Sequence, residues 1–150
     1  MPIDNLNYIQ SSVEILSQFI NNHVSNIIVR NEMPKLDESK DIGKPLLFLE
    51  ILPGSNKEVG MGRRGVNGKR GIWKNVDMFA HWIVSDKVGG TPKMLQLAGL
   101  LEHEIPTFQH ELKQQGIETI RISPLRQFAK GNAKFYGGRH MITFRVFMEL

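Results

Sequence analysis

The last third of the chain constrains the fold most, because it holds the two most regularly patterned segments. In residues 92–113, apolar side chains recur at steps of four and three residues, which is the spacing of one buried stripe on a helix. In residues 139–150, apolar and polar side chains alternate, as they do in a strand with one buried face. A long helix followed by a long strand predicts a sheet covered by helices. The buried face of this strand is predicted to hold Ile142, Phe144, Val146, Met148 and Leu150.

The predicted helix 92–113 carries its own start, kink and stop signals. Thr91 supplies a hydroxyl that can cap the first turn, and Pro92 has the fixed backbone angle favoured at the first helical position. Pro106 lies inside the helix and removes one backbone donor, so we predict a kink near residues 102–105. Gly116 is predicted to end the helix.

The rest of the chain supplies a second helix and further strands. Residues 6–23 repeat the helical stripe, and residues 25–30, 46–52 and 117–123 are predicted as short strands. Residues 72–84 form a longer strand. One of its faces is apolar and the other is mixed, so we expect a partner to cover part of the mixed face. The apolar face holds Val76, Met78, Ala80, Trp82 and Val84, and the mixed face holds Asn75, Asp77, Phe79, His81 and Ile83.

These elements predict one α+β domain spanning residues 1–150. We expect a mainly antiparallel sheet of about four to five strands, two helices packed on one of its faces, and a long basic loop at residues 54–71. A chain of 150 residues with 41% hydrophobic side chains is large enough for a real core. The predicted contact between the long helix and the sheet consists of Leu101, Ile105, Phe108, Ile120, Ile122, Phe144 and Val146.

Positive charge is concentrated in two segments of the chain, which has a formal net charge of +4. Residues 54–71 contain six glycines and one acid, and residues 121–145 contain no acid. Because glycine leaves the backbone free and like charges repel, we predict that the loop 54–71 is mobile until a partner orders it. The basic residues of the first segment are Lys57, Arg63, Arg64, Lys69 and Arg70, and those of the second are Arg121, Arg126, Lys130, Lys134, Arg139 and Arg145.

No complete catalytic or cofactor motif is present. The spacing of Gly62 and Gly68 is one residue too long for a phosphate-binding loop, and Arg70 stands where that loop needs a hydroxyl. His103 and His110 are seven residues apart on the predicted helix, too far for one zinc ion, and we expect both to be solvated. The chain has no cysteine and no Gly-x-Ser-x-Gly turn. We therefore predict a protein that is not an enzyme and has no cofactor or metal.

The basic loops leave three interpretations open. The first is a cationic surface for nucleic acid, on which Phe128, Phe135 and Tyr136 stack against bases. The second is that the loops are merely solvated, and the third is that they are docking segments that become ordered on a neighbouring subunit. No helix-turn-helix, RNA-recognition or zinc-finger pattern supports the first interpretation. The longest apolar run, residues 46–49, is far too short to span a bilayer, and residues 1–5 do not resemble a secretion signal, so we expect no membrane partner.

The order of these segments resembles the tail terminator, or tail completion, proteins of long-tailed bacteriophages. The resemblance covers most of the chain: an N-terminal helix, a short apolar strand at residues 46–52, and a long strand ending in Met78-Phe79-Ala80-His81-Trp82-Ile83-Val84-Ser85. The long helix 92–113 follows, then a Gly-Ile-x-x-Ile-Arg-Ile strand at residues 116–122 and a closing strand containing Thr143-Phe144-Arg145-Val146. The basic segment 54–71 is longer than this family's pattern leads us to expect.

The resemblance implies a structural virion protein made in the host cytoplasm. It implies a ring, usually hexameric, that caps the tail tube, ends tail polymerisation and joins the tail to the head connector, with DNA close by in the channel. The alternatives are another neck component of the same fold or a small basic nucleic-acid-binding protein. The predicted assembly residues are Lys57, Arg63, Arg64, Lys69, Arg70, Phe79, His81, Arg126, Lys130 and Lys134.

Overall fold

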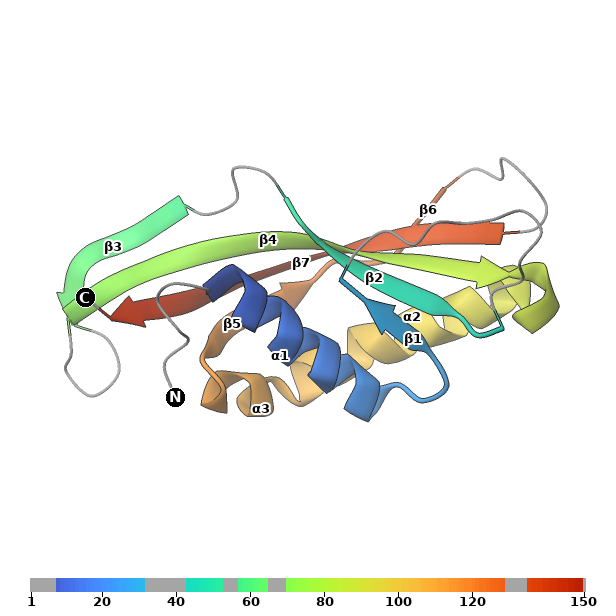
Figure 1. Ribbon diagram of the computed structural model, residues 1–150, viewed down its shortest axis with the longest axis horizontal. Coiled ribbons are helices and arrows are strands. Elements are labelled where there is room, and N and C mark those ends of the chain that lie inside the picture. The colour runs from blue at the N-terminus through green and yellow to red at the C-terminus, as the bar shows by residue number, and fades with distance from the viewer. Residues whose placement is uncertain (1–7, 32–42, 53–56, 65–69, 129–134, 150) are drawn as a thin grey trace.

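Two long strands, β4 (Arg70–Ser85) and β7 (Phe135–Glu149), pair antiparallel along their length and form the centre of the sheet (Figure 1). The computed structural model describes residues 8–31, 43–52, 57–64, 70–128 and 135–149, with the backbone alone for residues 57–64, 70, 71, 135, 148 and 149. Both strands carry alternating apolar side chains, so each offers a full face for burial.

Shorter strands extend this central pair on both sides. β2 (Leu46–Ile51) pairs antiparallel with β4, and β1 (Ile28–Arg30) pairs parallel with β2. On the other side, β5 (Ile117–Ile122) and β6 (Arg126–Gln127) pair antiparallel with β7. The main order is β1-β2-β4-β7-β5, and the sheet has seven strands when β3 and β6 are included. The predicted α+β fold is confirmed, with a larger sheet than the four to five strands expected.

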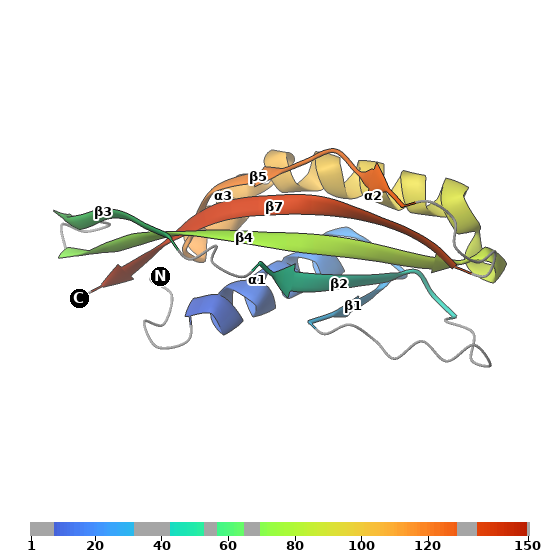
Figure 2. The same ribbon diagram turned by 90° about the horizontal axis from the view of Figure 1, so that it is seen from above.

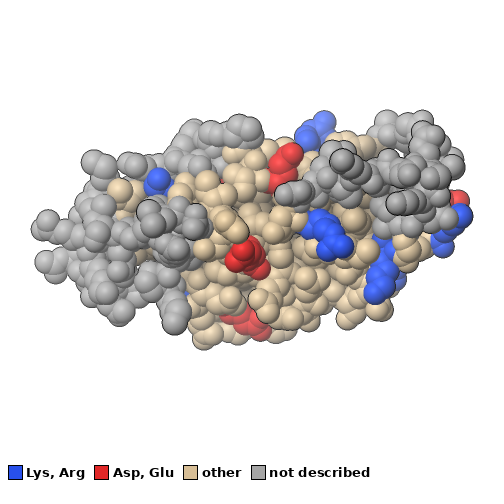
Figure 3. Space-filling view, viewed as in Figure 1, with Lys and Arg blue, Asp and Glu red and all other residues tan. Residues whose placement is uncertain are grey.

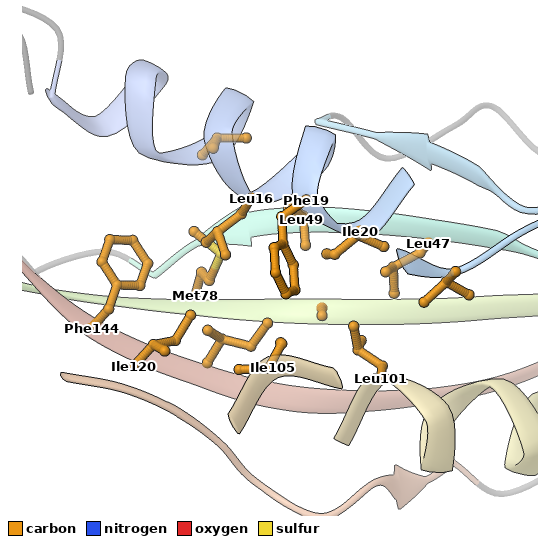
Figure 4. Close-up of a cluster of buried hydrophobic side chains, with 14 of the residues drawn as sticks. Leu16, Phe19, Ile20, Leu47, Leu49, Met78, Leu101, Ile105, Ile120 and Phe144 are labelled. Atoms are coloured by element: carbon orange, nitrogen blue, oxygen red, sulfur yellow. The ribbon is translucent and has the colours of Figure 1, made fainter. Parts of the chain in front are cut away.

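The helices lie on one face of the sheet, as predicted. α1 (Tyr8–His23) runs beneath the β1–β2 half, and α2 (Gly90–Thr107) runs beneath the β7–β5 half (Figure 2). Between these helices and the sheet lies a single large core, part of which is drawn in Figure 4. The predicted apolar face of β4 is confirmed, because Val76, Met78, Ala80, Trp82 and Val84 are all buried in this core.

The contact between α2 and the sheet follows the sequence prediction closely. Five of the predicted residues are buried, and Phe108 and Ile122 are half-buried against the same core. Burial of this apolar area is the main favourable contribution to the stability of the fold. The five buried residues are Leu101, Ile105, Ile120, Phe144 and Val146.

The start and the break of the long helix differ from the prediction. A short 3-10 turn, η2 (Asp86–Val88), precedes α2, and Gly89, with φ of 117°, occupies the N-cap position in place of Thr91. Residues 102–105, where the sequence predicts a kink, are continuous with the rest of α2. The helix instead breaks at Phe108, two residues after Pro106, and α3 (Gln109–Gln114) follows. Proline removes only its own donor, and the N–H of Phe108 still reaches the Glu104 carbonyl at 3.0 Å, so the preceding turn stays helical.

Part of the predicted loop 54–71 is a strand. β3 (Lys57–Arg64) pairs antiparallel with the first half of β4, with a register shift between Val59 and Arg63. Residues 54–56 and 65–69 lie outside the described part of the chain. β4 is longer than its neighbour β2, and its backbone groups beyond β2 need hydrogen-bond partners, which β3 supplies. This end of the sheet extends beyond the helices (Figure 1).

Candidate assembly surface

The sheet has one face that the described helices do not cover, which we call the open face. It carries the alternate residues of β4 and β7, those that do not point into the core. On β4 it holds the mixed set predicted from the sequence, in which Ile83 is buried and Phe79 and His81 are half-buried. The described part of the chain therefore leaves a face with apolar and aromatic side chains near the surface.

A small apolar cluster lies at the β2 side of the open face. Leu46, Phe48 and Ile83 are buried there, and Ile28 packs against them. This cluster is separate from the main core because β2 has apolar residues on both faces. A strand apolar on both faces is typical of strands that are covered on both sides.

A row of planar side chains crosses the open face, and we call it the aromatic row. His81 stacks on Phe48, with ring centroids 4.4 Å apart, and meets Phe79 edge-on at 5.5 Å. The guanidinium of Arg139 lies over Phe79, 4.1 Å from the ring centroid, and 5.4 Å from Phe128. Arginine over an aromatic face is an attractive cation–π arrangement. The row therefore presents flat apolar rings and positive charge together on one surface.

A second aromatic group lies toward the β3 end of the open face. Trp73 and Phe147 pack at 5.1 Å between ring centroids, and the guanidinium of Arg145 lies 4.5 Å from the centroid of Trp73. The Nε of Arg145 is buried and has no hydrogen-bond partner in the described structure. A buried donor without an acceptor costs roughly 1–3 kcal/mol.

A hollow of about 420 Å³ adjoins this group between β4, β7 and β5. Arg121 and Arg145 line it together with the carboxylate of Asp77. Thr119, also in its lining, has φ of 54°, which is unfavourable for a β-branched residue. The remaining lining residues are Asn75, Thr143 and Phe144.

Three of the predicted assembly residues lie on the open face. Phe79 and His81 belong to the aromatic row, and Arg126 is paired in register with Arg139 of that row. The predicted assembly residues did not include Phe48, Trp73, Arg139 and Arg145 of this face. The alternation of apolar and polar residues in the segment 139–150 could have found Arg139 and Arg145, because both stand at positions on the face opposite the core.

The other predicted assembly residues are described in part or not at all. Four of them lie in the β3–β4 hairpin, where only the backbone is described, and three lie outside the described residues. The hairpin residues are Lys57, Arg63, Arg64 and Arg70, and the undescribed residues are Lys69, Lys130 and Lys134.

The described charges are unevenly spread over the side of the molecule seen in Figure 3. Lys and Arg side chains gather mainly toward the end where β4 leads into α2, and Asp and Glu side chains lie nearer the middle. An uneven distribution of charge on a surface favours one orientation of a charged partner over the others.

One titratable cluster joins the helices on the other side of the sheet. Nδ1 of His23 on α1 lies 2.9 Å from Glu104 on α2, and its Nε2 lies 2.9 Å from Glu111 on α3. The ring also stacks on Phe19 and contacts Phe108, at centroid distances of 4.1 and 4.7 Å. Burial lowers the pKa of His23, but the hydrogen bonds and charges of Glu111 and Glu104 outweigh it and raise the pKa above 6.5.

The remaining histidines give no metal-binding group. His103 and His110 are exposed, as predicted, and no three of the His, Asp and Glu side chains described here gather in a way that could hold a metal ion. None of the helices in the described ranges is both long and apolar enough to cross a bilayer.

No protein-family model matches this chain, and no curated protein matches it.

Proposed function

We propose that this protein is a non-catalytic subunit that assembles into a ring, ends the polymerisation of a phage tail tube and joins the tail to the head connector. The observation that carries the proposal is the open face, with its aromatic row and a projecting β3–β4 hairpin beside it. Rings form through heterologous contacts, in which one surface of a subunit meets a different surface of the next. The open face, with the hairpin beside it, is one such surface.

The composition of the open face suits a protein partner. Interfaces are enriched in aromatic residues, methionine and arginine. Phe128 and Met141 are exposed on this face by 46% and 38%, and Arg139 lies beside them. Burying the two apolar side chains would contribute favourably to association, while Arg139 would give the contact specificity.

The oligomeric state tests the proposal directly. We expect the purified protein to form rings at high concentration, visible by electron microscopy and measured by mass photometry. The double substitution Phe128→Ser and Met141→Ser should shift the population toward monomers. A matched control is Leu95→Ser with Leu100→Ser on α2, because these leucines are exposed by 50% and 38% but lie on the helical layer. Equal loss of rings in both variants would remove the open face from the proposal.

The hairpin is tested by its charge. Substituting serine for Arg63, Arg64, Lys69 and Arg70 should leave the fold intact, because the sequence predicts these charged residues outside the core, where substitutions usually change stability by less than about 0.5 kcal/mol. It should impair ring assembly or tail joining, giving unjoined heads and tails or tails of uncontrolled length. If this variant joins heads and tails normally, the charge of the hairpin has no role in assembly. If a phage that lacks the protein still makes finished virions, the whole proposal is refuted.

Binding of single-stranded nucleic acid is the second candidate, and the aromatic row is the observation that favours it. Bases stack on aromatic rings, and cationic side chains attract the phosphate backbone. Phe79, Arg139 and Phe128 supply these groups on one sheet face. A protein that stays monomeric and binds DNA with an affinity that falls steeply with salt would favour this function over ring assembly.

A further inference from the structure

The edge strand β5 has a bulge that opens the sheet at Thr119. The register of β5 against β7 shifts between Glu118 and Arg121. Two hollows, of about 420 and 450 Å³, lie beside this bulge, and Thr119 and Arg145 line both of them. Bulges re-aim side chains and end regular pairing, and they are common at sheet edges and beside functional sites. The bulge therefore gives access to Arg145 from the β5 edge.

The backbone at Thr119 is held in an unfavourable conformation. Its φ of 54° lies in the left-handed region, which costs a β-branched residue roughly 1–2 kcal/mol. Thr119 is exposed, so burial of its own side chain does not offset this cost. Strain of this kind persists where the surrounding structure imposes it, and it is concentrated at functional sites.

The two arginines in the first hollow differ in how they are held. Arg145 packs over Trp73 and its Nε is buried, whereas Arg121 is exposed. Asp77 is the acid among the lining residues, so the lining carries two positive charges and one negative charge. Lys113 and His110 line the second hollow, with Glu118 as its acid. The edge therefore keeps an excess of positive charge.

A carboxylate is the group that suits this edge. The guanidinium group presents a planar set of donors that matches a carboxylate, and Thr119, Thr143 and Asn75 add hydroxyl and amide donors. A second copy of this chain offers carboxylates on the side of the molecule away from β5. The exposed acids Glu14 and Glu50 lie on the α1 side of the molecule.

The positions of these groups permit a head-to-tail contact. β5 with α2 lies along one long side of the molecule, and α1 with β1 and β2 lies along the other (Figure 2). Subunits placed side by side would bring the β5 edge of one copy to the α1 side of the next. This is a heterologous contact, which a closed ring repeats around its axis.

We propose that the hollow lined by Arg121 and Arg145 at the β5 edge binds a carboxylate from the α1 side of a second copy of this chain. The inference rests on the proposed ring function and names the ionic contact between neighbouring subunits. Arg145 is held in position against Trp73 before the carboxylate binds. Arg121 is exposed and moves to contact the carboxylate when it binds.

A zero-length cross-link tests the contact. Arg121→Lys keeps the positive charge and adds an amine that carbodiimide can join to a carboxylate in direct contact. Equal amounts of ¹⁴N- and ¹⁵N-labelled variant are mixed, assembled and cross-linked, and peptide mass spectrometry identifies the acid. We expect mixed-isotope peptides that join position 121 to Glu14 or Glu50. Lys93 on α2 is the internal control, because its amine is present in every variant and it lines neither hollow, so it should give no mixed-isotope link to Glu14 or Glu50.

A loss-of-charge variant gives an independent measurement. Arg121→Gln should weaken self-association about tenfold or more, since loss of one partner leaves the other charge without a counterion. Lys93→Gln, which removes one positive charge from α2, should change it much less. Rings that form without a mixed-isotope cross-link, or with a link only to Asp77 or Glu118 of the same chain, would overturn this inference and leave the ring proposal standing. A chain that stays monomeric at every concentration would overturn both.

Discussion

The indole nitrogen of Trp82 donates a hydrogen bond to Nε2 of His140 across 3.0 Å inside the core. The other ring nitrogen, Nδ1, lies 3.1 Å from the carbonyl oxygen of Ser123 and donates to it. Only a neutral ring that carries its proton on Nδ1 satisfies both contacts. A second proton, on Nε2, would point the N–H of His140 at the N–H of Trp82. Burial lowers the pKa of His140, although the Ser123 carbonyl and the charge of Glu102 act in the opposite direction.

We predict that His140 makes the protein less stable in mild acid. The unfolded chain takes up a proton at its ordinary pKa of 6.5 while the folded chain resists it, so stability is full above pH 6.5 and falls as the pH drops toward the lowered pKa. Urea unfolding between pH 5 and 7 measures this, and His140→Gln should reduce the slope while keeping an acceptor for Trp82. An NMR titration that gives His140 a pKa above 6.5 would contradict the prediction.

We predict the opposite pH dependence for His23. Its raised pKa means that the folded chain holds the proton more tightly, so its stabilising effect is full below pH 6.5 and is lost as the pH rises through the raised pKa. His23→Gln should remove this dependence and loosen the junction of α1, α2 and α3. His110→Gln is the control, because His110 is exposed and is not a member of this cluster. A pH profile identical in the wild type and His23→Gln would refute the role of the cluster.

Truncation to alanine should cost different amounts of unfolding free energy at Phe108 and Phe144, although the sequence predicts both in the core. Phe144 is 3% exposed, so Phe144→Ala should cost about 3–5 kcal/mol of unfolding free energy. Phe108 is half-buried at the helix break, so Phe108→Ala should cost roughly half as much. Denaturant unfolding of both variants checks the order. Wild-type stability in Phe144→Ala would show that the β7 assignment is wrong.

Thr119→Gly should stabilise the subunit. Glycine adopts a φ of 54° without the steric cost that threonine bears, and we expect a gain of about 0.5–1 kcal/mol after the entropy cost of glycine. Asn26→Gly is the control. Asn26 has φ of 62°, but asparagine tolerates this region, so little change is expected there. Thermal unfolding measures both, and a destabilised Thr119→Gly would show that the bulge is not strained.

Side-chain periodicity alone determined the main helices, the long strands and most of the core that they enclose. The helical stripe in residues 6–23, the alternation in residues 72–84 and 139–150, and the resulting α+β layers are all present in the fold. Periodicity succeeds here because each of these elements buries one complete face, and burial of apolar area decides which face that is.

Tertiary structure decided the features that depend on distant partners. Lys57–Arg64 looks like a loop by composition, yet the free edge of β4 supplies the hydrogen bonds that make it a strand. The same holds for the aromatic row, whose members come from β2, β4, β7 and the residue after β6. Local sequence sets the spacing of side chains along one element, whereas strand pairing and register decide which residues of different elements meet.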